Sequence, residues 1–142
     1  DRQLKVRRQW LDRDGEPIDR QDIEVGDLIR VKVTVQAPQL NDGRTIHNVA
    51  IVDALPGGLE VENPKLETSA TFGASAAEPD HQQFREDRVL LFTSVTHKTK
   101  TFHYALRAVT PGTFKLPPVQ ASCMYDAGFA SVAGGATIEV ER

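Results

Sequence analysis

The chain has 142 residues, which suits one domain built around a single hydrophobic core. Hydrophobic residues make up 39% and charged residues 26%, and the net charge of −3 comes from both signs interspersed along the chain. Because nucleic-acid grooves and anionic membranes need clustered Lys and Arg, we expect no nucleic-acid partner and no direct membrane contact. No apolar run reaches the roughly 20 residues that cross a bilayer.

The N-terminus and the cysteine content bear on the context of the chain. Asp1 opens directly into strand-like sequence, without an initiating Met or a signal peptide, so we expect residues 1–142 to be a single domain cut from a larger protein. Cys123 is the only cysteine, which excludes an internal disulfide and a zinc site built on several cysteines. We interpret Cys123 as a small buried apolar side chain.

Alternating apolar and polar residues predict the first strands. Leu4, Val6 and Trp10 alternate with polar neighbours over 4–10. The stretch 28–37 alternates apolar with polar residues, and the stretch 45–55 carries apolar residues on both faces. Because Asn41-Asp42-Gly43 lies between these two runs, we predict that they form a β-hairpin against which the other elements pack.

The middle of the chain contains a long polar segment and a second pair of strands. Residues 67–83 are poor in large apolar side chains, and we predict a surface excursion with at most a short helix over 75–77. Residues 88–95 are apolar on both faces, and 101–109 place Phe102, Tyr104 and Leu106 on one face. Because only a short polar link separates these runs, we predict a second hairpin.

The C-terminal strands contain a change of phase. Apolar residues fall on even positions over 114–116 and on odd positions over 119–123, with Pro117-Pro118 between them. Proline cannot donate to a ladder, so we predict an edge strand that breaks and rejoins with its inward face reset. A last strand over 136–141 follows Gly134-Gly135. With about seven or eight short strands and no strong helix, the fold class predicted is an all-β, antiparallel two-sheet sandwich.

The sequence favours no catalytic or metal-binding site. The four histidines lack the i, i+4 spacing of a helical metal pair, and Ser94 near His97 lacks a Gly-x-Ser-x-Gly elbow. The glycines of Pro56-Gly57-Gly58 lack the following Lys and helix of a phosphate loop. We therefore expect no enzyme activity, no cofactor and no metal.

Two small charged groups are interpreted as ordinary surface. Asp53, Glu60 and Glu62 surround Pro56, and solvated rim charges explain them best. The basic pair Arg7-Arg8 and the lysines at 98 and 100 are too sparse for a track of phosphate contacts.

One cluster suggests a contact site. Met124, Tyr125 and Asp126 follow the proline-bent segment, and Phe129 comes soon after them. Exposed Met and aromatic residues give large, adaptable contact area. The residues alone leave two interpretations open, a contact with a partner or a plug in which Tyr125 or Phe129 closes one end of the sandwich, and they slightly favour the plug.

Several stretches, taken in order, resemble a known family. They are Gly26-Asp27, Asp53-Ala-Leu-Pro-Gly-Gly-Leu-Glu60 with Glu62-Asn-Pro64, Arg85-Glu-Asp-Arg88, Phe102 to Phe114 including Thr110-Pro-Gly-Thr-Phe114, Leu116-Pro-Pro118, Ala121-Ser-Cys-Met-Tyr-Asp126 and the strand after Gly134-Gly135. Over roughly residues 8–142 the chain is similar to the C-terminal macroglobulin-like domain, usually counted tenth, of bacterial α2-macroglobulins. The combination of Thr-Pro-Gly-x-Phe-x-Leu-Pro-Pro with Met-Tyr-Asp carries the resemblance.

The resemblance implies a function that the residues alone do not. Members of that family are large periplasmic or cell-envelope proteins, often lipid-anchored at a distant N-terminus in the inner membrane, that trap target proteases after cleavage of a bait segment. Many hold the protease through an internal thioester. The terminal domain is thought to pack against the thioester domain and shield it, a role that maps onto Met124 and Tyr125, with Asp126 and Phe129 as further rim residues. The thioester motif Cys-x-Glu-Gln is absent from this chain.

Two other classes of binding module remain open at this point. An Ig-like adhesive or spacer repeat of a bacterial surface protein shares the Gly-Asp strand start and the Leu-Pro-Gly-Gly-Leu stretch. A carbohydrate-binding sandwich would need a row of exposed aromatic residues, and most aromatic residues here are predicted to point inward.

Overall fold

The computed structural model describes residues 3–12, 14–18, 21–40, 43–62, 81–85 and 87–142. Within these ranges the regular structure is all strand, and no helix long and apolar enough to cross a membrane is found. In chain order the elements are β1 (Lys5–Leu11), β2 (Ile23–Glu24), β3 (Leu28–Gln36), β4 (Ile46–Ala54), β5 (Leu59–Val61), β6 (His81–Phe84), β7 (Arg88–Val95), β8 (Lys100–Ala108), β9 (Gly112–Leu116), β10 (Val119–Cys123), β11 (Asp126–Ala133) and β12 (Ala136–Glu141).

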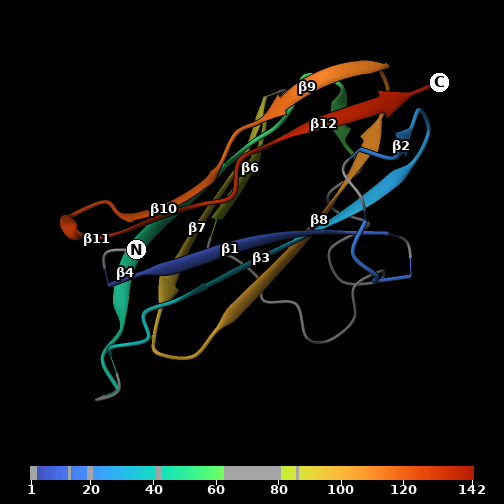
Figure 1. Ribbon diagram of the computed structural model, residues 1–142. Coiled ribbons are helices and arrows are strands. Elements are labelled where there is room, and N and C mark those ends of the chain that lie inside the picture. The colour runs from blue at the N-terminus through green and yellow to red at the C-terminus, as the bar shows by residue number, and fades with distance from the viewer. Residues whose placement is uncertain (1–2, 13, 19–20, 41–42, 63–80, 86) are drawn as a thin grey trace.

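The strands form three sheets (Figure 1). The first sheet has the order β1-β3-β8-β5, the second β11-β10-β4-β7-β6, and the third, smaller one β2-β12-β9. Neighbouring strands are antiparallel except for β12 and β2. The predicted all-β sandwich is confirmed. The described strands exceed the seven or eight expected because the chain also makes short edge strands and breaks one long hairpin in two.

The core lies between the inward faces of the two larger sheets. Every second residue of β3 from Ile29 to Val35 is buried, and β8 buries Phe102, Tyr104 and Leu106. These residues join apolar side chains of β1, β4, β7, β10 and β12 in one buried cluster. Burying each such side chain stabilises the fold by roughly 1.5–3 kcal/mol, which explains why the period of two is maintained along these strands.

Both predicted hairpins are wrong. β3 pairs with β1 and β8 in the first sheet, whereas β4 pairs with β10 and β7 in the second. Likewise β7 belongs to the second sheet and β8 to the first. Each pair of runs buries its apolar face against the opposite sheet, so the links are crossovers between layers. The two crossovers meet at one end of the sandwich, where the Ala37 amide donates to the Thr96 carbonyl over 2.8 Å.

The predicted excursion over 67–83 ends earlier than expected. Residues 81–83 belong to β6, which pairs antiparallel with β7 at the edge of the second sheet. The rest of that segment, including the short helix predicted over 75–77, lies outside the described residues.

The strands β9 to β12 form one long hairpin that passes from one sheet to another. β9 pairs with β12 in the third sheet, and β10 pairs with β11 in the second. The interruptions fall at Pro117-Pro118 and at Gly134-Gly135, and both glycines have positive φ, which a residue without a Cβ adopts readily. The predicted break and change of phase are therefore confirmed. The predicted edge position holds for β9 only, because β10 lies between β11 and β4.

Candidate functional site

The turn between β10 and β11 presents the predicted contact residues. Cys123 is in register with Asp126, so Met124 and Tyr125 form a two-residue hairpin loop. The side chains of this Met-Tyr tip are exposed, Met124 at 51% and Tyr125 at 80%. The interpretation of Tyr125 as a plug is therefore wrong. Phe129 matches that interpretation better, because it is half-buried and packs against the core.

The backbone of the Met-Tyr tip is unusual for so short a loop. Two-residue hairpin loops favour positive φ, which matches the twist of the flanking strands, yet neither Met124 nor Tyr125 has it. The ladder instead shifts register between Ser122 and Cys123. Ser122 is opposite Ala130 and Cys123 is opposite Asp126, so the extra residues are 127–129 of β11 and include Gly128. A bulge of this kind increases local twist and re-aims the side chains beside it.

A second irregularity, on β4, supports the Met-Tyr tip. The Met124 amide donates to the Asn48 carbonyl over 2.9 Å. Asn48 has a φ of 61° and lies within a register shift of β4 against β7. Asparagine tolerates this left-handed conformation better than most residues. The Cys123 thiol contacts the His47 carbonyl at 3.4 Å, and Cys123 is half-buried, less than we predicted.

Asp126 braces the far side of the same turn. Its Oδ1 accepts a hydrogen bond from the Gly128 amide at 2.9 Å, a local turn typical of Asp. The Gly128 carbonyl in turn accepts from the Gln3 side-chain amide at 3.0 Å. These bonds connect the hairpin to the start of β1, so Asp126 holds the tip in shape while its side chain remains exposed.

At the other end of β10, a buried ion pair joins the two large sheets. Arg8 Nη1 on β1 donates to Asp53 Oδ1 on β4 at 2.5 Å, and Arg8 Nη2 donates to the Pro117 carbonyl at 2.8 Å. The Arg8 and Asp53 side chains are only 1% and 4% exposed. The interpretation of Asp53 as a solvated rim charge is therefore wrong. Sequence reasoning also missed Arg8, although it shares the even, inward positions of Val6 and Trp10.

Burial dominates the electrostatics of this pair. It raises the pKa of Asp53 to about 6, even though the charge of Arg8 and its hydrogen bond both lower it. The carboxylate remains the main form at neutral pH, and it neutralises a guanidinium that is equally enclosed. A buried pair of this kind strongly penalises the loss of either partner, because the other charge is left without compensation.

The remaining members of the predicted acidic group behave differently from Asp53. Glu62 Oε2 accepts from Arg107 Nε at 2.8 Å, and both side chains are about a third exposed. Glu60 is exposed on β5. For these two residues the prediction of rim charges holds.

The Pro56-Gly57-Gly58 turn has a packing role. A Cβ built on Gly58 would lie 2.4 Å from the Phe114 ring, and one on Gly57 would lie 3.4 Å from it. Phe114 is half-buried and packs against the core at this point. The glycines therefore allow the ring to rest directly on the backbone, which links the Leu-Pro-Gly-Gly-Leu stretch to the Thr-Pro-Gly-x-Phe stretch.

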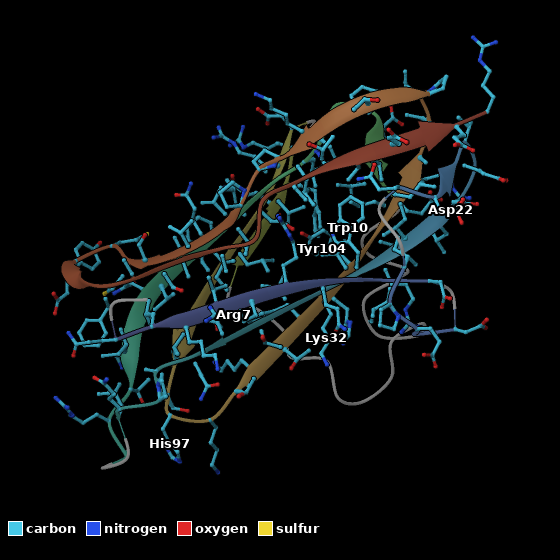
Figure 2. All side chains as sticks on the ribbon, viewed as in Figure 1. Arg7, Trp10, Asp22, Lys32, His97 and Tyr104 are labelled. Atoms are coloured by element: carbon cyan, nitrogen blue, oxygen red, sulfur yellow. The ribbon has the colours of Figure 1, made fainter. Side chains whose placement is uncertain are left out.

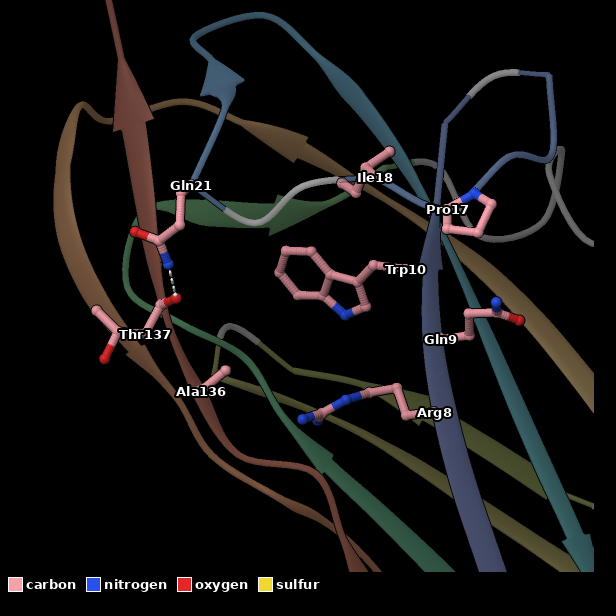
Figure 3. A pocket seen from close by; sticks show the side chains of 8 residues that line it. All are labelled: Arg8, Gln9, Trp10, Pro17, Ile18, Gln21, Ala136 and Thr137. Atoms are coloured by element: carbon pink, nitrogen blue, oxygen red, sulfur yellow. Dashed lines mark hydrogen bonds between the residues drawn. The ribbon is translucent and has the colours of Figure 1, made fainter.

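A cavity of about 410 Å³ opens between β1 and β12, and Trp10, Ile18 and Ala136 form part of its lining (Figure 3). Gln21 and Thr137 also belong to this lining, and the Gln21 side-chain amide donates to the Thr137 carbonyl at 2.6 Å. Its lining contains no carboxylate, histidine or cysteine, so it offers no pair of groups for acid–base or nucleophilic chemistry.

Over the described ranges, no group of three or more His, Cys, Asp or Glu residues is placed to hold a metal ion. His103 lies half-buried on the outward face of β8, where burial and then the charges of Arg30 and Lys32 hold its pKa below the usual value. The described residues thus offer a protruding Met-Tyr tip and a buried ion pair at the root of the same hairpin.

Two facing antiparallel sheets joined by crossovers define an Ig-like β-sandwich domain, here one with a hairpin shared between sheets. Comparison with known proteins identifies the family. Residues 4–127 match the family described as the bacterial alpha-2-macroglobulin MG10 domain, and the chain belongs to that family.

Relatives and solved structures agree with this assignment. The chain is 33% identical to an alpha-2-macroglobulin of Xylella fastidiosa over 138 residues, covering 88% of this chain and 8% of that protein. It is also 33% identical to the alpha-2-macroglobulin of Pasteurella multocida over 131 residues, covering 87% of this chain and 6% of that protein.

Among solved structures, native Escherichia coli alpha-2-macroglobulin from domain MG7 to the C-terminus superposes with a TM-score of 0.84 at 29% identity, covering 98% of this chain and 23% of that one. A Salmonella alpha-2-macroglobulin mutant superposes with a TM-score of 0.85 at 30% identity, covering 98% and 9%. This chain therefore spans less than a tenth of the two curated relatives described above.

Proposed function

We propose that this chain is the non-catalytic C-terminal domain of a bacterial alpha-2-macroglobulin that inhibits proteases, and that its Met-Tyr tip covers the thioester of a neighbouring domain. The observation that carries the proposal is the exposure of Met124 and Tyr125 at the end of a braced hairpin. Large apolar side chains on a rigid turn suit contact with another domain, since little ordering is needed when they bind.

The chemistry of a thioester explains why such a cover would help. Water hydrolyses a thioester, so a native inhibitor must exclude solvent until the bait segment is cut. A phenol ring and a thioether provide a wide apolar cover that can withdraw as a unit when the domains rearrange. Among the solved relatives, one Salmonella alpha-2-macroglobulin was reacted with methylamine, the amine used in the test below.

The test is made in the full-length parent inhibitor. Tyr125→Ala is expected to speed the reaction of the thioester with methylamine, measured as thiol release, because water and amines gain access. Tyr125→Phe keeps the ring and should react like the parent. Val132→Ser provides a matched control, because Val132 is 58% exposed on the same hairpin but lies away from the tip. Equal rates for Tyr125→Ala and the parent would refute the cover.

The proposed partners and location follow from the same role. The domain would contact the thioester domain directly and target proteases only through the parent protein. The parent would reside in the periplasm or cell envelope, held at the inner membrane by a lipid on a distant N-terminus. Cell fractionation of the parent tests this, and recovery in the cytoplasm would contradict it.

A further inference from the structure

The outer faces of the two large sheets differ in composition. On β3 the outward positions carry polar side chains such as Lys32, Thr34 and Gln36, which suit a solvated surface. Lys32 lies on the outer side of the first sheet and Tyr104 on its buried side (Figure 2). The second sheet lacks this contrast, because its inner strands β4 and β7 carry apolar residues on both faces. An antiparallel strand of that composition is typical of a sheet that is covered on both sides.

Strand register joins the outward residues of β10, β4 and β7 into one surface. Val52 on β4 is opposite Gln120 on β10 and Leu90 on β7, so these three side chains form a row across the sheet. Ala50 is opposite Ser122 in the next row on the same side. The apolar members are half-buried, and Gln120 and Ser122 are exposed. We call the surface formed by these five residues the neutral face.

The surroundings of the neutral face contain little charge. Among the described outward positions of β4, β7 and β10, only Arg88 is an Asp, Glu, Lys or Arg, and it lies at the start of β7 opposite Ala54. A single exposed apolar residue needs no explanation. An apolar row that crosses neighbouring strands without a charge is different, because the centre of a protein interface is depleted in charged residues.

We propose that the neutral face is a docking surface for an apolar surface of another domain of the same inhibitor, centred on Val52 and Leu90. The proposal rests on the proposed function only in taking this chain as one domain of a larger inhibitor, and it requires no thioester. The chain spans 8% and 6% of the Xylella and Pasteurella relatives. Domains tethered in one chain meet at a millimolar effective concentration, so a modest apolar contact is enough to hold them together.

The position of the Met-Tyr tip agrees with a docked domain. β10 carries Gln120 and Ser122 on the neutral face and leads directly into the turn that presents Met124 and Tyr125. A domain that contacts the tip would therefore lie next to the neutral face. The two surfaces together offer a larger contact area than either does alone.

The composition of the neutral face favours a protein domain over a bilayer or a second copy of the chain. In a bilayer, the Gln120 amide and the Ser122 hydroxyl would enter hydrocarbon without hydrogen-bond partners, which is costly. Membrane-surface elements also combine apolar side chains with clustered Lys and Arg. A second copy would compete with tethered domains that are present at a much higher local concentration. A protein domain can pack against Val52 and Leu90 and still pair the polar groups beside them.

Photo-cross-linking in the full-length parent inhibitor tests this docking. Gln120→benzoylphenylalanine places a benzophenone on the neutral face, where light joins it to C–H groups in direct contact. We expect a covalent product with a peptide of another domain, identified by mass spectrometry. The same probe at Thr34 is the matched control, because Thr34 is an outward residue on an inner strand of the first sheet. Equal interdomain yields from the two positions would overturn the proposal.

Charged variants then test whether the neutral face makes the contact. Leu90→Glu introduces an uncompensated charge that weakens docking by roughly a hundredfold or more, so the product from position 120 should fall about tenfold. Ser122→Glu is a second variant at an exposed position, where the change leaves folding intact, and it should also lower the yield. Thr34→Glu adds the same charge to the first sheet and should leave the yield unchanged. Circular dichroism of each variant confirms that it is folded.

The remaining outcomes assign the neutral face to a different occupant and overturn the proposal. Products confined to residues 1–142 would show that this chain covers its own sheet, and products that join two inhibitor molecules would show a second copy. Binding to phospholipid vesicles that Leu90→Glu abolishes and Thr34→Glu preserves would show a bilayer. Methylamine reactivity does not enter this test, so a failure of the thioester cover leaves its result unaffected.

Discussion

The two ends of β10 differ sharply in how they are held. At its root, Arg8, Asp53 and the Pro117 carbonyl form a buried network that joins both large sheets. At its tip, Met124 and Tyr125 are exposed, and backbone hydrogen bonds together with side-chain contacts of Gln3, Cys123 and Asp126 hold the turn. The difference teaches that the root can position the tip, while the exposed side chains of the tip are expected to contribute little to folding. Side chains that contribute little to folding can be replaced without loss of stability, so a contact with a partner can determine which residues occupy such positions.

Removing the buried carboxylate should give the largest effect. Asp53→Ala is expected to lower the free energy of unfolding by about 3–5 kcal/mol, because the enclosed Arg8 guanidinium then loses its buried hydrogen-bond acceptor, which a protonated Asp53 would still provide. Urea denaturation followed by circular dichroism measures it. Glu62→Ala is the matched control, since its pair with Arg107 is about a third exposed, and it should cost only about 0–1 kcal/mol. Equal costs would show that the root is no stronger than a surface pair.

Asp53 should also give the domain an unusual dependence on pH. The pKa of Asp53 is about 6 in the folded state against 3.8 for an unburied carboxyl, so its contribution to stability is complete below pH 3.8 and is lost as the pH rises through 6. The full change is about 3 kcal/mol. His103, with a lowered pKa, acts in the opposite direction, because protonation of its imidazole at falling pH reduces the stability of the folded domain.

Comparing unfolding at several pH values between 4 and 7 isolates the Asp53 contribution. Asp53→Asn cannot titrate, so the stability of this variant relative to the parent chain should rise across that range. A constant difference between the two chains would mean that Asp53 has the same pKa in the folded and unfolded states.

Filling the backbone contact beneath Phe114 should give a smaller effect. Gly58→Ala places a Cβ 2.4 Å from the ring and must displace it, which we expect to cost about 1–3 kcal/mol. Gly57→Ala provides the comparison, because its Cβ would sit at 3.4 Å, an ordinary contact. Thermal unfolding of both variants should separate them, and a Gly57→Ala chain as unstable as Gly58→Ala would contradict the packing role.

Truncating the tip should give the smallest effect on folding. Tyr125→Ala is expected to change the free energy of unfolding by no more than about 0.5 kcal/mol, since the side chain is 80% exposed. The same denaturation experiment measures it. A loss of several kcal/mol would show that the ring is part of the fold after all and would erase the contrast between the two ends of β10.

The sequence predicts the strands and the sandwich well because burial imposes a period of two on each strand, as in 28–37 and 101–109. It fails on pairing, since the period records which face is buried and says nothing of which strand lies alongside. A turn-like Asn41-Asp42-Gly43 therefore suggests a hairpin where the chain changes sheets.

The candidate site is predictable only in part. The motif around Met124 and Tyr125 locates the proposed contact residues, but the register shifts beside them, in β4 and between β10 and β11, are not evident from the sequence. The buried ion pair carries a signal, because Arg8 and Asp53 both occupy the inward phase of their strands. Because charged residues are usually assigned to the surface, the inward position of Arg8 and Asp53 is overlooked when the sequence is interpreted.

The proline and glycine breaks set the length of the hairpin arm formed by β10 and β11. Only Val119–Cys123 separate the proline break from the turn. Because successive side chains alternate, one added residue would rotate the tyrosine to the reverse side, whereas a pair added to each strand would extend its reach by roughly 7 Å and preserve its aim. Related domains with longer or shorter arms should therefore differ by even numbers of residues.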